Sequence, residues 1–134
     1  MNEWKIVWTD RRGVHEIILC GQDRVLDYLA DVHSRERSLR PVVEILKRPS
    51  DSPSLSIVVG GDETVVTYEG SIDPPYFISI GDSERQGLSQ PFFHGRQGVE
   101  HLAKNLVPFA SALRAVSEFL EEGGRPTALS WERL

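Results

Sequence analysis

The sequence contains very little cysteine and no long hydrophobic run. Cys20 is the single cysteine among 134 residues, which excludes an internal disulfide framework. No apolar stretch approaches the roughly 20 residues that a membrane-spanning helix needs, so we expect no contact with a membrane. The opening residues 1–8 also lack the basic start and long apolar core of a signal peptide. We therefore expect a cytoplasmic protein whose residues 1–134 fold as one domain with a substantial core.

Motifs of catalysis and cofactor binding are also missing. The sequence has no GxSxG elbow, no GxGxxG loop and no Walker loop. Its four histidines are not spaced as zinc ligands, and Cys20 has no CxxC partner. We therefore expect no catalytic residue, no cofactor site and no metal site, and we do not expect an enzyme. Cys20 ends an apolar segment, for which a buried, unreactive thiol is the favoured interpretation.

The net charge of −5 is modest, but the charges are unevenly distributed, because lysine and arginine are absent from the middle of the chain. Between Pro49 and Glu84 there is no base, whereas acids recur throughout this span. These acids are Asp51, Asp62, Glu63, Glu69, Asp73, Asp82 and Glu84. Nucleic-acid binders need clustered Lys and Arg, so we expect no direct binding of nucleic acid. The acids form either an ordinary solvated surface or a negative patch that attracts a basic protein partner.

An amphipathic helix near the C-terminus is the clearest element in the sequence. From Pro108 onward, apolar residues recur at helical spacing and define one buried face. These residues are Phe109, Ala112, Leu113, Val116, Phe119 and Leu120. Gly123 and Gly124 suit a left-handed helix end, and Pro126 prevents continuation. Residues 127–131 then alternate as a strand, so we expect the helix to pack on a sheet that includes this strand.

Further segments carry the patterns of strands, and one carries the pattern of a helix. Strands are predicted at 3–8, 14–20, 42–46, 55–59, 64–69, 76–80 and 90–94, and a helix at 22–33. Residues 95–106 show no period and are predicted to form a loop. This order predicts the α+β class, with a mainly antiparallel sheet of about six to eight strands and two helices.

The residues Gly60-Gly61-Asp62-Glu63 match the start of the signature of diguanylate cyclases. Thr64 stands where that family has an aromatic residue, and the chain is short for that domain. Glycines tolerate the positive φ values that a tight hairpin needs. A plain hairpin turn between two strands is therefore the favoured interpretation.

Aromatic residues fall into two groups. Trp4, Trp8 and Trp131 lie on predicted strands, where tryptophan is usually part of the core. Tyr68 and Tyr76 lie among the acids of two neighbouring hairpins, and aromatic residues within charged patches are typical of protein-binding surfaces. The candidate partner-binding residues are therefore Asp62, Glu63, Tyr68, Glu69, Asp73, Tyr76, Asp82 and Glu84. Asp82, which follows a glycine, is also suited to capping a turn.

Several segments, in this order, resemble a family of bacterial immunity proteins. The C-terminal ones are the apolar helix that ends in Phe119-Leu120, the following Glu121-Glu122-Gly123-Gly124-Arg125-Pro126, and a strand with Trp131-Glu132. The central one is Tyr76–Asp82, which follows the Gly60 hairpin and Tyr68. The family is the one numbered first among the antidotes of polymorphic toxin systems. The resemblance covers nearly the whole chain, although residues 48–54 and 95–106 match little.

The resemblance implies a cytoplasmic antidote that binds and blocks a cognate secreted toxin, often a nucleic-acid toxin of the cytidine-deaminase superfamily. It assigns no contact residues and implies no catalysis. A toxin that acts on nucleic acid needs a basic channel for phosphates, and an acidic inhibitor suits such a channel. We therefore expect a basic toxin domain as the partner, bound at its substrate channel or active site. A small-molecule-binding or sensory α+β module is the alternative, and the sequence leaves the oligomeric state open.

Overall fold

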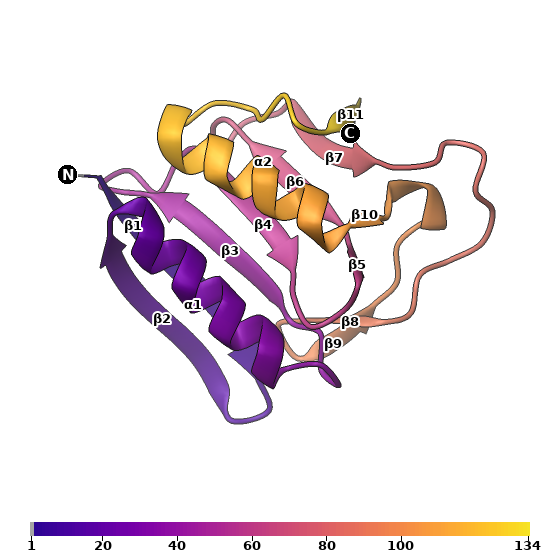
Figure 1. Cartoon of the computed structure of the whole chain (residues 1–134), viewed down its shortest axis with the longest axis horizontal. Helices are drawn as coiled ribbons and strands as arrows, with labels where there is room; N and C mark the ends of the chain where they lie inside the picture. The colour runs from indigo at the N-terminus through magenta and orange to yellow at the C-terminus, as the bar shows by residue number, and fades with distance from the viewer. Residues whose placement is uncertain (1) are drawn as a thin grey trace.

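The chain forms one seven-stranded antiparallel sheet with both α-helices on the same face (Figure 1). The computed structural model describes residues 2–134. The strands of the large sheet are β1 (Glu3–Asp10), β2 (Gly13–Cys20), β3 (Val42–Lys47), β4 (Ser54–Val58), β6 (Val66–Glu69), β7 (Tyr76–Ile80) and β11 (Ser130–Arg133). Their order is β11-β7-β6-β4-β3-β1-β2. Two small sheets pair β5 (Glu63–Thr64) with β10 (Val107–Pro108) and β8 (Phe92–His94) with β9 (Gln97–Val99). The predicted α+β class is therefore confirmed.

β1 and β2 form the N-terminal hairpin, in which Trp4, Ile6 and Trp8 face the helices. All three are buried in the main core, as predicted for both tryptophans. β2 is an edge strand and has no buried residue. Cys20 at its end is exposed, so the prediction of a buried thiol is wrong. The sequence pattern of a strand does not show whether the strand has neighbours on both sides. β2 has a neighbour on one side only, which leaves Cys20 exposed.

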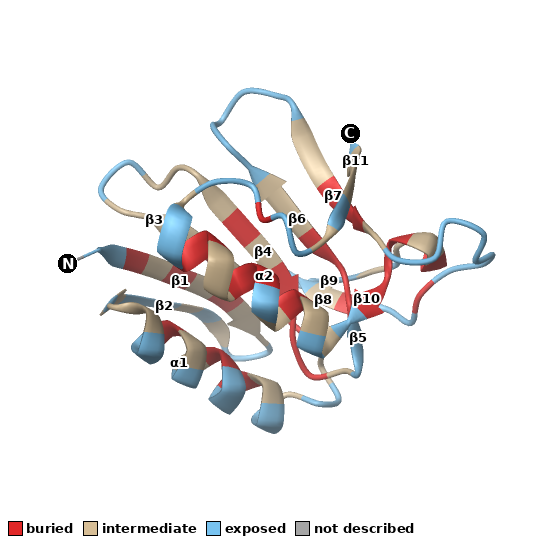
Figure 2. Ribbon diagram, turned by 45° about the horizontal axis from the view of Figure 1, so that its top comes forward, coloured by how far each residue is buried: buried red, intermediate tan, exposed pale blue. Residues whose placement is uncertain are grey.

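The two helices bury their apolar faces against this sheet (Figure 2). α1 (Gln22–Arg35) buries Val25, Leu29 and Val32. α2 (Phe109–Glu122) buries Ala112, Ala115, Val116, Phe119 and Leu120. The ring of Phe119 lies 5.3 Å from that of Trp4 on β1. Gly123 follows α2 with a φ of 77° and donates its N–H to the Phe119 oxygen, so the predicted C-terminal helix and its glycine end are confirmed.

The opposite face of the sheet is covered at one end by the segment between β7 and α2. Side chains alternate between faces, so Val58 and Ile78 point away from the helices. They are buried with Phe92 in a second core cluster. Residues 95–106 were predicted to be a loop. They contain β9 and a 3-10 turn, η1 (Ala103–Asn105). The prediction missed both because such short elements hold too few residues to show a period.

Two strands have bounds that differ from the predicted ones. In both, a side-chain oxygen accepts a backbone N–H in place of a neighbouring strand. The predicted strand 64–69 is divided into β5 and β6, and the Thr64 hydroxyl accepts a backbone N–H at 2.9 Å. The final strand begins at Ser130 and not at Thr127. Glu118 on α2 accepts both the backbone N–H and the hydroxyl of Thr127, which ties that residue to the helix.

Candidate functional site

The predicted partner-binding residues on the surface fall at two opposite ends of the sheet. β6 begins beside the glycine hairpin and ends at the loop that leads to β7. β7 is antiparallel to β6 and therefore returns towards the hairpin. The hairpin end carries Asp62, Glu63, Asp82 and Glu84, which we call the hairpin-end acids. The other end carries Glu69, Asp73 and Tyr76, which we call the loop-end group.

The glycine hairpin is held in place by both helices. Gly60 has a φ of +96°, and a Cβ atom on it would lie 2.4 Å from the backbone oxygen of Glu36. Its N–H donates to Nδ1 of His33 on α1 at 2.7 Å. The backbone oxygen of Asp62 accepts the N–H of Phe109, the first residue of α2, at 2.9 Å. These contacts confirm a hairpin turn and give the hairpin-end acids a rigid support.

The hairpin-end acids are not free of bases in space. Arg85 donates two hydrogen bonds to the carboxylate of Glu63, at 2.6 and 3.2 Å. Asp62 lies 3.7 Å from a guanidinium nitrogen of Arg37, and 96% of its side chain is exposed. The premise that no base relieves these acids is therefore wrong, because the fold brings arginines from outside the base-free span. Since these ion pairs are exposed and screened by solvent, each contributes little to the stability of the fold.

Asp82 and Glu84 follow the end of β7 in a tight turn. The Asp82 carboxylate accepts the backbone N–H of Glu84 at 3.0 Å, which is the turn-capping contact that the sequence suggested. Gly81 fixes the start of this turn, because a Cβ atom on it would lie 1.9 Å from the oxygen of Leu106. Both acids are exposed, and neither makes an ion pair with another residue of the described chain.

The loop-end group lies in the loop between β6 and β7. Glu69 and Asp73 are exposed and have no ion-pair partner among residues 2–134. The hydroxyl of Tyr76 donates to the backbone oxygen of Ile72 and so closes the loop. The N–H of Asp73 donates to the Ser71 hydroxyl at 3.2 Å. Of the two acidic surfaces, the loop end is therefore the one whose acids make no ion pairs with basic residues of the described chain.

Tyr68 belongs to the core rather than to either acidic group. Its ring packs edge-on against Phe119 at 6.1 Å and lies 6.5 Å from the rings of Phe77 and Trp131. Burial raises the pKa of its hydroxyl. Alternation along β6 directs this side chain towards α2, and sequence proximity to acids did not reveal that.

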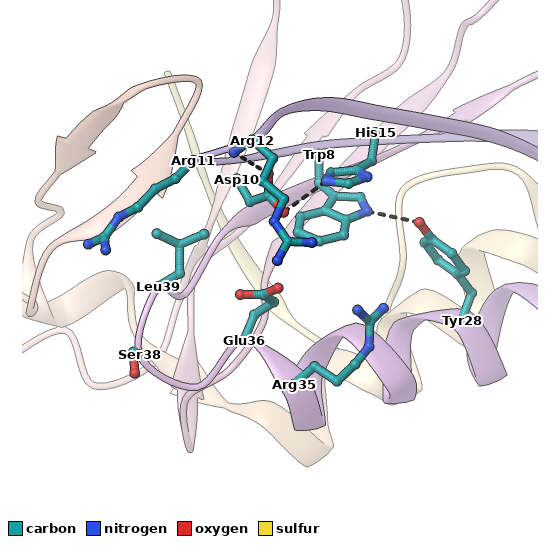
Figure 3. A pocket seen from close by; sticks show the side chains of 10 residues that line it. All are labelled: Trp8, Asp10, Arg11, Arg12, His15, Tyr28, Arg35, Glu36, Ser38 and Leu39. Carbon is teal, nitrogen blue, oxygen red and sulfur yellow. Dashed lines mark hydrogen bonds and ion pairs between the residues drawn. The ribbon is translucent and has the colours of Figure 1, made fainter.

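A cleft of about 560 Å³ opens between the tip of the β1–β2 hairpin and the end of α1 (Figure 3). It is lined by Trp8, Asp10, Arg11, Arg12, His15, Tyr28, Arg35, Glu36, Ser38 and Leu39. The Trp8 indole N–H donates to the Tyr28 hydroxyl at 2.9 Å, and the His15 ring stacks on Trp8 at 4.3 Å. The floor of the cleft is therefore a fixed aromatic group.

Arginines surround this cleft, and the sequence interpretation did not single them out. Asp10 is already engaged by His15 at 2.9 Å and by the backbone N–H of Arg12 at 2.8 Å. Arg11 and Arg12 make no ion pair with any other residue in the described range 2–134. The signal that was available is the pair of arginines between the predicted strands 3–8 and 14–20, a short connection that projects both side chains into solvent.

Within residues 2–134, no three His, Cys, Asp or Glu side chains are grouped so that they would hold a metal ion. Neither helix in that range has the length and apolar character needed to cross a membrane.

Comparison with known proteins gives one result of consequence. The family described as immunity protein Imm1 matches residues 16–133. No curated protein matches the chain. The match begins inside β2 and runs through β11, so it includes both helices, both acidic surfaces and every strand of the large sheet except β1 and the start of β2. The chain belongs to the Imm1 family of immunity proteins.

Proposed function

We propose that this immunity protein binds a cognate secreted toxin domain of the cytidine-deaminase type in the cytoplasm and blocks its access to nucleic acid. Family membership supports the antidote role. The toxin class is the one that the resemblance implies, and the electrostatic argument supports a basic, nucleic-acid-targeting partner. A deaminase that acts on nucleic acid must hold phosphates in a basic channel. An inhibitor that presents acids to that channel gains association rate and excludes the substrate.

The observation that carries this proposal is the rigid display of the hairpin-end acids. Asp62 projects almost fully into solvent from a turn that both helices hold in place. Asp82 and Glu84 project from the adjacent turn without ion pairs in the described chain. A preorganised acidic surface loses little conformational entropy on binding, which favours affinity. The loop-end group is the second acidic surface and is the competing location for the same contact.

The pairing of Glu63 with Arg85 adds a feature to this surface. A toxin arginine that approaches Glu63 would compete with Arg85 for the same two carboxylate oxygens. Glu63 is therefore expected to contribute less to binding than Asp62 or Glu84. We do not propose catalysis at this surface, and the partner is a protein rather than a nucleic acid.

Paired charge reversals distinguish the two surfaces. Asp62→Lys with Glu84→Lys alters the hairpin end, and Glu69→Lys with Asp73→Lys alters the loop end. Glu121→Lys with Glu122→Lys is the matched control, because it makes the same change of charge at the exposed end of α2. Each variant is titrated against the toxin domain encoded beside this chain, at low and high salt.

We expect the hairpin-end variant to bind about tenfold or more weaker at low salt, with a reduced salt dependence. The control should bind as the unmodified protein does. Deamination of cytidine in single-stranded DNA or RNA by the toxin should resume in the presence of the hairpin-end variant. Unchanged affinity in both acidic variants would overturn the acidic surface, and a toxin without deaminase activity would overturn the assigned toxin class.

A further inference from the structure

The edge strand β2 is open to pairing along its whole length. It is eight residues long and none of its residues is buried. In Figure 1 it is the outermost strand of the sheet on its side, and no other segment lies beyond it. Three of the seven large hydrophobic residues exposed in the described chain lie on it, namely Val14, Ile17 and Ile18. Apolar side chains are therefore concentrated on this one edge.

Natural sheets usually protect such an edge with lysine, proline, a bulge or a short strand. β2 contains no lysine or proline, and its register against β1 runs without a bulge from Cys20 to Gly13. The opposite edge differs, because β11 is four residues long and two of them, Glu132 and Arg133, are charged. One edge of the sheet is thus protected and the other is not.

The hydrogen-bonding pattern defines which groups of β2 are free. The Gly21 N–H donates to the Asn2 oxygen at 3.2 Å, and antiparallel strands bond through alternate residues. The odd-numbered residues of β2 therefore bond to β1, and the N–H and C=O groups of the even-numbered residues point away from the sheet. Val14, Glu16, Ile18 and Cys20 present these free groups.

We propose that β2 pairs antiparallel with β2 of a second copy of this chain, about a twofold axis at Ile17. Two seven-stranded sheets then become one continuous sheet. We assign the pairing strand to a second copy because β2 can pair antiparallel with itself in a register that uses its free backbone groups. Only even-numbered residues are free to bond, so the axis falls on a residue, and Glu16, Ile17 and Ile18 are the positions nearest the middle of the strand. An axis at Glu16 sets two carboxylates opposite each other, and an axis at Ile18 leaves Val14 unpaired.

The axis at Ile17 pairs Val14 with the partner's Cys20 and Glu16 with the partner's Ile18. It uses every free residue of the strand and opposes no like charges. Exposed apolar side chains from both copies then lie side by side, which removes them from water.

Charge at the two ends of β2 supports the same arrangement. Arg11 and Arg12 lie at the hairpin tip and make no ion pair in the described chain. At the other end, the Glu3 carboxylate lies 3.7 Å from the Cys20 thiol. Asp23, in the first turn of α1, lies at the same end. Antiparallel pairing brings the tip of each copy to the acidic end of the other. Arg24 also lies at that end. The two arginines of one copy would therefore meet two acids and one base of the other copy.

Register-specific crosslinking tests the proposal. Residues at the axis form a pair without backbone bonds, in which the Cα atoms are about 4.5 Å apart, and this distance allows a disulfide. Ile17→Cys in a Cys20→Ser background should therefore form a covalent dimer under mild oxidation. Ile18→Cys in the same background is the matched control, since its neighbour across the axis would be Glu16. We expect about tenfold more dimer from the first variant. Equal crosslinking of both variants would overturn the register.

Sedimentation of the uncrosslinked chain tests the dimer itself. We expect a concentration-dependent dimer that Ile17→Lys converts to a monomer, with an unchanged circular dichroism spectrum, because two lysines would then face each other at the axis. Arg11→Asp and Asp23→Arg should each raise the dissociation constant by about tenfold, because each contact occurs twice, and the double variant should restore it. A monomer at every concentration would overturn the proposal. If Ile17→Lys then abolished toxin binding, the edge would belong to the toxin.

Discussion

Single residues decide how firmly the hairpin end of the sheet is held. Gly60 and Gly81 are both placed where a side chain has no room, but they differ in backbone conformation. Gly60 has a positive φ, so replacing it combines strain with a clash. Gly81 is not among the glycines with a positive φ, and a Cβ atom on it would clash with the backbone of Leu106. Gly81 therefore isolates the effect of close packing between β7 and the segment before α2.

Gly81→Ala should destabilise the protein by about 3 kcal/mol, the upper end of the usual cost of overpacking, because a backbone oxygen cannot rotate away. Gly124→Ala is the matched control, since a Cβ atom there has open space around it. Its effect should stay within about 0.5 kcal/mol. Urea denaturation of both variants measures the difference. Equal midpoints would show that the close approach at Gly81 relaxes without cost.

His33 connects the same hairpin to pH. Burial is the main cause that lowers its pKa below 6.5, and Arg37 lowers it further. Nδ1 accepts the Gly60 N–H, which requires an unprotonated nitrogen. Because the unfolded chain binds the proton more readily, the stabilisation is fully present above pH 6.5. It is lost as the pH falls from there through the lowered pKa of the folded protein.

We expect the free energy of unfolding to fall as the pH drops below 6.5, and His33→Asn to reduce this slope. Asparagine keeps an acceptor near Nδ1 but does not titrate. Burial also lowers the pKa of His101, so part of the slope should remain in the variant. Thermal melts across this pH range supply the measurement, and an unaltered slope in His33→Asn would remove His33 from the account.

At the scale of elements, the long periodic segments were predictable, whereas some of the shortest elements were not. The fourteen residues of α2 repeat their apolar positions often enough to define a face, and Gly123 marks the end. β9 and η1 have three residues each and show no period. The start of β11 was misplaced because Glu118, nine positions earlier, takes the Thr127 N–H. Such a long-range contact is not visible in local alternation.

The candidate surface shows the same division. The sequence indicated which residues are acidic and which turns display them. It did not show that Arg85 would reach Glu63, that Tyr68 would turn inwards, or that the sheet would separate the acids into two groups. All three depend on strand register and on loops that return to the sheet, and neither follows from composition.

The packing of α2 on the sheet has a direct test at the element scale. Phe119 is fully buried and contacts the rings of Trp4 on β1 and Tyr68 on β6. Phe119→Ala should cost about 3–5 kcal/mol, because the cavity it leaves is enclosed by rigid aromatic neighbours. Arg114→Ala on the exposed face of α2 is the control and should change stability by less than about 0.5 kcal/mol. A loss below about 1 kcal/mol for Phe119→Ala in a denaturant melt would contradict this packing.

At the scale of the whole molecule, the two proposed surfaces lie on different strands of the sheet. β2 forms one edge, whereas the acidic surfaces lie at the ends of β4, β6 and β7, and β1 and β3 separate these strands from β2. Self-association through β2 therefore leaves the acidic ends of both copies accessible. A dimeric antidote would present two equivalent toxin-binding surfaces.

This geometry predicts a complex of two antidote chains with two toxin domains. Light scattering of the purified complex should give the mass of a 2:2 assembly, and Ile17→Lys should give a 1:1 complex. The affinity of each toxin for its site should be the same in both, because β1 and β3 separate Ile17 on β2 from the strands that carry the hairpin-end acids. Asp62→Lys with Glu84→Lys should have the converse effect, leaving a dimer of the antidote that binds toxin weakly. Loss of toxin binding together with dimerisation in Ile17→Lys would show that the two surfaces are one, and would contradict the separation that the sheet order indicates.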